Sequence, residues 1–261
     1  FFVNAGIRFI EETCKMRAFV KLWERIGRER YSITDERALR FRYGVQVNSL
    51  GLTEAQPENN VQRIVLEMLA VTLSKEARAR SVQLPAWNEA LGLPRPWDQQ
   101  WSLRMQQVLA FETDLLEYED IFDGSHVIET KTAQFVDQAW TEMNEILSLG
   151  GAFEAVEALK GRLVQSMSSR TSRIEKGEQR VIGVNAFTQT AQSPLASTDN
   201  ILKVDPKIEK QMVKELQKWR DSRDQKAVDR ALITLKTAAK SKSNLMPPSI
   251  ELAIAGGTTG E

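Results

Sequence analysis

Residues 37–85 decide the fold class, because they switch from a strand pattern to a helix pattern and back. Residues 37–47 read RALRFRYGVQV, an alternating run rich in large side chains that predicts a β-strand. The following NSLGLTEAQPENN has many turn-forming residues and no period, so we expect a loop. Residues 59–77 carry apolar side chains at helical spacing, and ARSVQLP at 79–85 predicts a short buried strand. This order is typical of parallel βαβ units.

The remaining segments are predicted mainly from helical periodicity. On the N-terminal side, apolar side chains recur at helical spacing through residues 3–28, which predicts a helix. The same reasoning predicts helices over 97–113, 130–148 and 151–174, two helices within 205–240 and one short helix after 246–249. Residues 181–184 form a short strand-like run, and the polar residues 188–204 are expected to be an extended linker. The predicted fold is therefore α/β, followed by a largely helical region and incomplete on its N-terminal side.

The composition is ordinary for a globular protein and excludes several functions. Lys plus Arg total 35 and Asp plus Glu total 35 in 261 residues, which argues against a nucleic-acid partner because such binders show a basic excess. No run of about 18 apolar residues occurs, which argues against a membrane partner. The single cysteine, Cys14, cannot form an intrachain disulfide, so a cytoplasmic location is predicted. The start at Phe1, without an initiator Met or signal-peptide features, indicates a piece of a longer protein.

The loop after residues 37–47 is the best local candidate for a binding site. Ligands of parallel α/β folds bind where loops leave the carboxyl ends of strands. Gln46, Asn48 and Asn60 supply amide donors and acceptors there, while Arg40 and Arg42 supply positive charge. A thioester ligand with a carboxylate and phosphates would suit such a mouth. The alternative is that the amides satisfy the loop backbone and that the arginines pair with nearby acids.

Other reactive residue types give weaker signals. His126 is the sole histidine, and without a second histidine or a cysteine cluster nearby no metal site is predicted, so a turn histidine bonded to backbone is favoured. Cys14 lies on the apolar stripe of its helix, which favours a buried, inert thiol. Trp87 stands in a turn and could line a site. No phosphate-binding loop and no nucleophile motif is present, so pattern alone indicates part of an α/β domain.

Several segments resemble one enzyme family in their order and spacing. They are FFVNAGIRFIEETCKMRAFVKLW, LTEAQPENNVQR, WNEALGLP, MQQVLAFET, DGSHVIE and EKGEQRVIGVNAF. Together, from Phe1 to about Phe187, they resemble the adenosylcobalamin-dependent acyl-CoA mutases, the methylmalonyl-CoA mutase family. Within the family, RYGVQVNSLGLTEAQPENN and the C-terminal tail resemble the ethylmalonyl-CoA branch. The methylmalonyl branch carries a histidine at the position of Gly44, and a glycine there leaves room for a larger alkyl group.

The resemblance implies the architecture and the partners. It implies that residues 1–187 are the C-terminal portion of a (β/α)8 barrel. Residues 188–261 would be an extended and helical linker leading toward a cobalamin-binding domain whose axial-histidine signature is not in this chain. The implied partners are an acyl-CoA substrate, the remainder of the barrel, the cobalamin domain and a second copy in a homodimer.

The resemblance also implies roles for individual residues. Gln46 would be catalytic, reaching between substrate and cofactor. The implied acyl-CoA site comprises Phe2, Gly44, Gln46 and Arg80. The implied adenosylcobalamin site comprises Ser49 facing the corrin, Glu89 and Ala90 at the adenosyl ribose, and Leu93 against the corrin.

The implied activity is that of an isomerase. Ethylmalonyl-CoA and methylsuccinyl-CoA would interconvert by a radical 1,2-shift, with the radical chemistry carried by adenosylcobalamin. One alternative is a methylmalonyl-CoA or related acyl-CoA mutase. Another is a non-catalytic barrel fragment or scaffold that lacks cobalamin.

Overall fold

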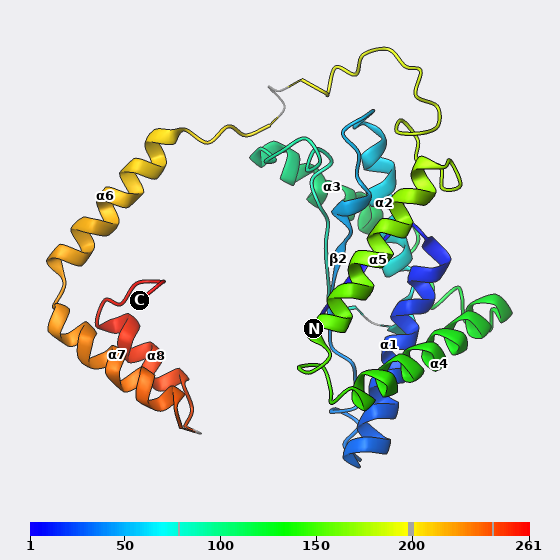
Figure 1. The fold of residues 1–261 in the computed structure, drawn as a ribbon. Helices are drawn as coiled ribbons and strands as arrows, with labels where there is room; N and C mark the ends of the chain where they lie inside the picture. The colour runs from blue at the N-terminus through cyan, green and yellow to red at the C-terminus, as the bar shows by residue number, and fades with distance from the viewer. Residues whose placement is uncertain (78, 198–200, 242) are drawn as a thin grey trace. The chain divides into compact units, whose positions relative to one another are not determined.

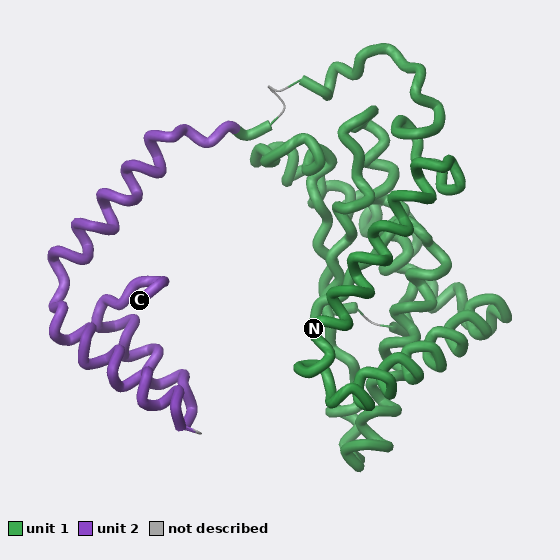
Figure 2. Tube along the Cα trace, in the orientation of Figure 1, with its two compact units in different colours: residues 1–202 green, residues 203–261 purple. Residues whose placement is uncertain are grey.

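The computed structural model describes residues 1–77, 79–197, 201–241 and 243–261. The chain divides into two compact units, residues 1–202 and residues 203–261 (Figure 2). The first unit holds a parallel sheet with helices, and the second is helical. The boundary predicted between residues 187 and 188 separates a barrel from a linker, which is a different division, and it stays a prediction.

A small parallel sheet organises the first unit. Its strands are β1 (Phe2–Ala5), β2 (Gly44–Val47) and β3 (Ser81–Gln83), hydrogen-bonded in the order β1-β2-β3. The register aligns Phe2 with Gly44 and Ser81, and Asn4 with Gln46 and Gln83. Because side chains alternate along a strand, these two cross-strand rows lie on the same face.

Helices follow each strand, as the alternation in the sequence predicted (Figure 1). The first unit contains α1 (Phe9–Tyr31), α2 (Asn59–Thr72), α3 (Pro96–Glu112), α4 (His126–Ser148) and α5 (Val156–Glu175), with short 3₁₀ turns at Ser49–Gly51 and Lys75–Ala77. The predicted helices over 59–77, 97–113, 130–148 and 151–174 are confirmed, with shifted ends. Helix α1 packs against both α2 and α4.

The core lies on one side of the sheet. One buried cluster joins Val47 of β2 to Ile64 and Met68 of α2 and to Trp87, and the other joins Val45 and Ala5 to Met16 of α1. The opposite face of the sheet carries the exposed Phe2, Asn4, Gln46, Ser81 and Gln83. Parallel sheets normally have both faces covered, so this open face is a surface that calls for a partner. The α/β class is confirmed; the strands of the described residues do not close a barrel, and the barrel stays a prediction.

Three local predictions were wrong in extent. The helix predicted over 3–28 overlaps strand β1, because Val3 and Ala5 turn toward the core while Phe2 and Asn4 turn away, and α1 begins only at Phe9. The strand predicted over 37–47 is confined to Gly44–Val47. Residues 181–184 form a turn closed by an isolated bridge between Ile182 and Ala186, not a strand.

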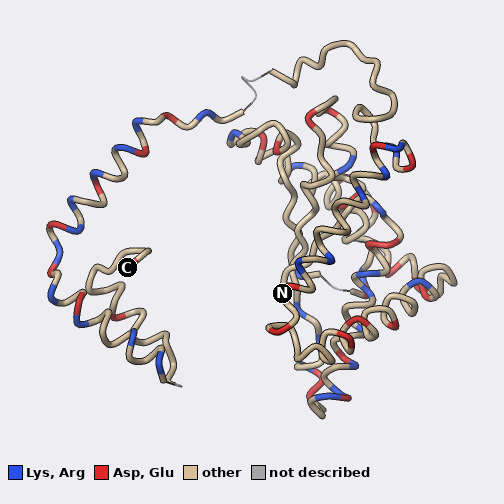
Figure 3. The backbone as a smooth tube through the Cα atoms, viewed as in Figure 1, with Lys and Arg blue, Asp and Glu red and all other residues tan. Residues whose placement is uncertain are grey.

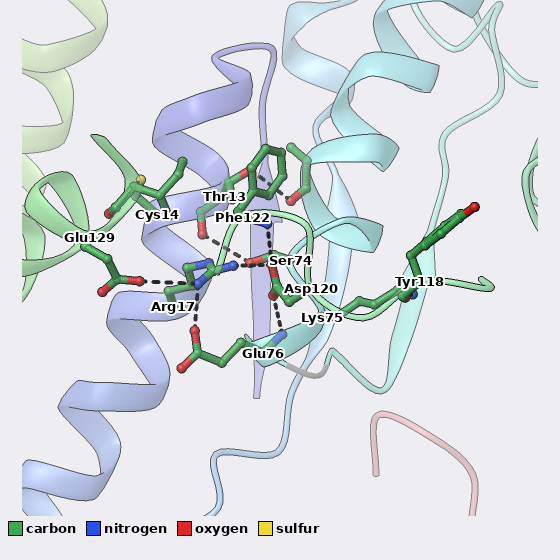
Figure 4. A network of polar contacts seen from close by, with 12 residues as sticks. Thr13, Cys14, Arg17, Ser74, Lys75, Glu76, Tyr118, Asp120, Phe122 and Glu129 are labelled. Carbon is green, nitrogen blue, oxygen red and sulfur yellow. Dashed lines mark hydrogen bonds and ion pairs between the residues drawn. The ribbon is translucent and has the colours of Figure 1, made fainter. Parts of the chain in front are cut away.

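A buried arginine ties the connection between α3 and α4 to α1 (Figure 4). Arg17 is 2% exposed and donates to the carboxylates of Glu76 and Asp120, both at 2.6 Å. Asp120 also accepts the backbone N–H groups of Glu76 at 2.7 Å and Phe122 at 3.0 Å. Arg17 Nε has no hydrogen-bond partner, but the two terminal nitrogens of Arg17 each bind a carboxylate. The network therefore ties the turn at 118–122 to α1 and to the 3₁₀ turn at Lys75–Ala77.

The second unit consists of α6 (Pro206–Ser222), α7 (Gln225–Ala239) and α8 (Met246–Ile254). The break predicted near Arg223 is confirmed, because Asp224 caps α7 by accepting the N–H of Ala227 at 3.1 Å. Figure 3 shows basic and acidic residues interspersed along the backbone of α6. Among the described residues, no helix combines the length and apolar character needed to cross a membrane.

Candidate functional site

A row of three amides crosses the open face of the sheet. Asn4, Gln46 and Gln83 stand side by side in the parallel register, one from each strand, and all three side chains are exposed. None of the three amide groups has a hydrogen-bond partner within the described parts of the chain. Amides held on rigid strands with free donors and acceptors are suited to grip a polar ligand. Gln46, predicted to be catalytic, lies at the centre of this row.

Two of these amides were missed by sequence reasoning. Asn4 fell inside the stretch assigned to a helix, and its signal is the alternation of Phe2 and Asn4 with Val3 and Ala5. Gln83 lay within the predicted strand, where the alternation of Ser81 and Gln83 with Val82 could have identified it.

The neighbouring row explains the glycine at position 44. An ideal Cβ at Gly44 would lie 2.6 Å from Ser81 Oγ and 2.8 Å from Phe2 Cε1. The space that a side chain would need is therefore taken by the Phe2 ring and the Ser81 hydroxyl. Phe2 is 74% exposed, so its ring can move, and a side chain at position 44 would have to displace it. Phe2 and Gly44, both predicted to bind substrate, are thus brought into contact.

Three arginines gather at the amino ends of the strands. Arg40, Arg42 and Arg80 line one cavity of about 460 Å³, together with Phe41 and Glu76. The backbone N–H of Arg80 donates to Tyr43 O at 2.9 Å, which continues the pairing of β3 with β2. The sequence placed Arg40 and Arg42 at the loop after β2, and this was wrong: they precede the short strand and lie at the opposite end of the sheet.

The residues predicted to meet the cofactor lie at the carboxyl ends of the strands. Ser49 belongs to the 3₁₀ turn after β2, and Glu89, Ala90 and Leu93 follow β3. Glu89 and Ala90 are exposed, and Leu93 is 54% exposed. The carboxylate of Glu89 has no partner among the described residues. All four residues therefore come after the carboxyl end of β2 or β3.

A buried aspartate anchors the segment that carries Glu89, Ala90 and Leu93. Asp98, 0% exposed, accepts hydrogen bonds from Trp87 Nε1 at 3.1 Å, Asn88 Nδ2 at 2.9 Å and Arg95 Nε at 3.0 Å. Burial works to raise the pKa of Asp98, but the hydrogen bonds from Arg95, Asn88 and Trp87 outweigh it, so that pKa is lowered. Trp87 is 1% exposed and therefore supports the segment from beneath instead of lining a site.

A second buried carboxyl lies behind the turn that carries Ser49. Glu67 of α2 is 1% exposed, its Oε2 has no hydrogen-bond partner, and its Oε1 lies 3.6 Å from an ideal Cβ at Gly51. Burial first, and the nearby Glu12 charge second, raise the pKa of Glu67 to about 8, against the opposing effect of Arg63. Glu67 is therefore mostly protonated at neutral pH.

The raised pKa of Glu67 makes stability depend on pH. Its protonated form stabilises the fold fully below the ordinary pKa of 4.5, and this contribution is lost as pH rises toward about 8. Glu67→Gln removes the ionisation, so we expect the variant to gain about 2–3 kcal/mol relative to the parent between pH 5.5 and pH 7.5. Denaturant midpoints of the full-length protein measure this, with the exposed Glu54→Gln as control. A difference between variant and parent that does not change with pH would contradict the prediction.

The remaining sequence candidates have structural roles. Cys14 is 0% exposed, which confirms the buried thiol, and burial raises its pKa. His126 is exposed and is the first residue of α4. Its imidazole forms no hydrogen bond with the described residues, so the prediction of a turn histidine bonded to backbone is wrong. No group of three or more His, Cys, Asp or Glu in the described ranges could hold a metal ion.

The fold and the open face define an α/β protein built from consecutive parallel βα units with free amides across the sheet. The sequence profile described as methylmalonyl-CoA mutase matches residues 1–261, which is the whole chain. The chain therefore belongs to the methylmalonyl-CoA mutase family, whose named relatives are mutases and hence isomerases.

Curated relatives separate the branches of the family. The chain is 62% identical over 262 residues to the ethylmalonyl-CoA mutase of Cereibacter sphaeroides, an alignment that covers 100% of this chain and 40% of that protein. It is 62% identical over 264 residues to the ethylmalonyl-CoA mutase of Methylorubrum extorquens, covering 100% and 38%. It is 29% identical over 265 residues to the methylmalonyl-CoA mutase of Rhizobium meliloti, covering 100% and 36%. The chain thus spans about two fifths of the length of these relatives, and the resemblance to the ethylmalonyl-CoA branch is confirmed.

Proposed function

We propose that the full-length protein is an adenosylcobalamin-dependent mutase that interconverts ethylmalonyl-CoA and methylsuccinyl-CoA. The observation that carries this proposal is the 62% identity to two proteins named ethylmalonyl-CoA mutase, against 29% to one named methylmalonyl-CoA mutase. An alternative within the family, a methylmalonyl-CoA mutase, is an outcome of the test below.

The chain contributes one section of a barrel wall in this proposal. Three βα units stand in sequence and in space in the same order, and repetition of parallel βα units builds (β/α)8 barrels. The exposed face with Asn4, Gln46 and Gln83 becomes the barrel interior once the remaining strands cover it. Residues 1–187 belong to the barrel and residues 188–261 to the linker toward a cobalamin-binding domain.

The distribution of side chains along the sheet suits an elongated acyl-CoA. Guanidinium groups at the amino ends, Arg80 with Arg40 and Arg42, match phosphate groups in geometry and charge. Phe2 and Gly44 follow, and Gln46 lies one step further toward the carboxyl ends. The amide of Gln46 donates to the thioester carbonyl oxygen and holds the migrating fragment while it moves.

The carboxyl edge fits the proposed cofactor. The free carboxylate of Glu89 can accept hydrogen bonds from ribose hydroxyls, and the exposed Leu93 offers an apolar contact for a ring system. Ser49 and Ala90, small residues on the same edge, allow close approach. When bound, adenosylcobalamin supplies the radical chemistry, and the residues of this chain orient the substrate and exclude water.

Turnover of the full-length protein tests the proposal. The enzyme is loaded with adenosylcobalamin and offered ethylmalonyl-CoA and methylmalonyl-CoA in parallel, with products read by mass spectrometry. Faster conversion of ethylmalonyl-CoA supports the proposal, and preference for methylmalonyl-CoA favours the alternative branch. No turnover of either, with no cobalamin retained after reconstitution, would overturn the mutase activity and favour a scaffold.

Gly44→His is expected to shift substrate preference. The imidazole would displace the Phe2 ring and the Ser81 side chain into the space beside Gln46. The activity with the bulkier substrate should therefore fall more than the activity with the smaller one. We expect kcat/KM for ethylmalonyl-CoA to fall about tenfold relative to that for methylmalonyl-CoA, the scale of one methylene group. Ser81→Ala, which removes only the hydroxyl, serves as control and should leave the ratio unchanged. Equal losses on both substrates for Gly44→His would count against a size effect.

A further inference from the structure

A cavity beside the first turns of α2 is not used by the residues assigned to the proposed reaction. Its volume is about 300 Å³, and it lies between the first turns of α2, the end of α5 and the segment at 179–182. Ile7, which follows β1, and Gly51, the last residue of the turn that carries Ser49, complete its lining on the side of the sheet. Its polar lining consists of Arg63, Arg170 and Arg180 together with Asn59, Gln62 and Gln179. No aspartate or glutamate lines it, and none of the residues predicted to bind acyl-CoA or cobalamin is among the lining residues.

The positive charge of this cavity is not neutralised. Arg170 and Arg180 have neither an ion pair nor a side-chain hydrogen bond within the described ranges. Arg63 donates to neutral acceptors: Thr53 Oγ1 at 2.8 Å, Asn60 Oδ1 at 2.7 Å and Ile182 O at 3.0 Å. Glu67, the carboxyl that interacts with Arg63, is mostly protonated at neutral pH because its pKa is about 8. Three arginines therefore line one small cavity that has no carboxylate among its lining residues.

We propose that this cavity binds an oxyanion, a phosphate or carboxylate group, between Arg170 and Arg180 with Arg63 fixed at its base. Guanidinium groups bind such groups by charge-assisted hydrogen bonds, and the neighbouring amides can donate as well. The anion is the missing counter-charge for groups that come from α2, α5 and the connecting segment.

The position of the cavity gives the anion a mechanical consequence. Arg63 holds Ile182 O, and Gln56 Nε2 donates to Phe187 O at 2.9 Å, so the segment at 179–187 already rests on the start of α2. An anion that joins Arg170 and Arg180 to Arg63 would lock α5 to the same place. The oxyanion has two possible sources, a phosphate-bearing small molecule or a carboxylate from the rest of the protein, and both present the same chemistry.

Calorimetric titration of the full-length protein tests the proposal, with inorganic phosphate and pyrophosphate as probes at low ionic strength. Saturable binding that Arg170→Gln and Arg180→Gln each weaken about tenfold supports a small-molecule source. Arg173→Gln, on the same helix but outside the cavity, is the matched control and should bind as the parent does.

The second source gives a different result. If a carboxylate of the protein fills the cavity, neither probe binds, but Arg170→Gln and Arg180→Gln lower the thermal midpoint by several degrees while Arg173→Gln does not. Absence of probe binding together with unchanged midpoints, or equal effects of all three substitutions, would overturn the proposal. Both readouts, probe binding and the thermal midpoint, are independent of mutase turnover, so failure of the proposed activity leaves the test intact.

Discussion

Gln46→Ala in the full-length protein is expected to lower kcat for ethylmalonyl-CoA about 100-fold to 1,000-fold, the usual effect of losing one preorganised hydrogen-bond donor at a reacting centre. The expectation rests on the proposed function. Gln46 stands on the central strand, exposed on the open face, and its amide is not committed to any described residue. Because β1 and β3 flank it, the backbone at Gln46 cannot shift to compensate for the lost side chain. Initial rates at saturating adenosylcobalamin measure the effect.

Controls separate position from simple loss of an amide. Gln134, an exposed glutamine on α4, gives a matched variant, Gln134→Ala, that should keep the parental kcat. Asn4→Ala and Gln83→Ala remove the neighbours in the same row and should reduce activity less, since neither lies at the centre. Gln46→Glu keeps the size but replaces the donor with a charge, and should be as inactive as Gln46→Ala. A kcat of Gln46→Ala within threefold of the parent would show that Gln46 does not hold the migrating group.

The contrast between Gln46 and Asn4 shows what local pattern can predict. Gln46 sits in a run whose alternation is unmistakable, so both its strand and its face could be predicted. Asn4 precedes Ile7 and Ile10, whose spacing extends the helical period backward across β1. Pairing with β2 overrides that period, and such pairing is a long-range property that no local window contains. The amide row as a unit could therefore not be predicted.

The two ends of the sheet show the same limit. Arg40 and Arg42 fell inside the strand predicted over 37–47, whereas the observed strand covers only Gly44–Val47 and leaves both arginines before its start. The error in the strand's start left the face of Gln46 unchanged, but it hid the position of the two arginines at the amino end of the sheet, away from the loop after β2. The long helices, by contrast, repeat their period often enough that α3, α6 and α7 could be predicted nearly to their ends, whereas the prediction for α2 ran five residues past Thr72.

Among the residues that support the site, Asp98 is the one whose loss should destabilise it most. Nothing in PRPWDQQ distinguishes a helix-capping aspartate from one that is fully buried, yet Asp98 serves as both. Its side chain accepts the backbone N–H of Arg95 at 2.8 Å as an N-terminal cap, and at the same time binds Trp87, Asn88 and the Arg95 guanidinium. Both ends of the segment from Trp87 to Arg95, which carries Glu89 and Leu93, are therefore hydrogen-bonded to the same carboxylate.

We expect Asp98→Ala to destabilise the full-length protein by about 3–5 kcal/mol, because it leaves the buried Trp87 N–H without an acceptor and removes the counter-charge of Arg95. Asp98→Asn should destabilise the protein less, since it keeps one acceptor and the volume.

The stability that Asp98 contributes should depend on pH. Because the pKa of Asp98 is lowered in the folded protein, this contribution is present above its ordinary pKa of 3.8 and is lost as pH falls through the lowered value. The difference in the free energy of unfolding between the parent and Asp98→Asn should therefore become smaller at acid pH. Denaturant midpoints and hydrogen exchange of residues 87–95 measure both effects, with the exposed Asp137→Ala on α4 as control. Unchanged exchange in that segment would mean that β3 and α3 hold it without Asp98, and that the carboxylate is a cap alone.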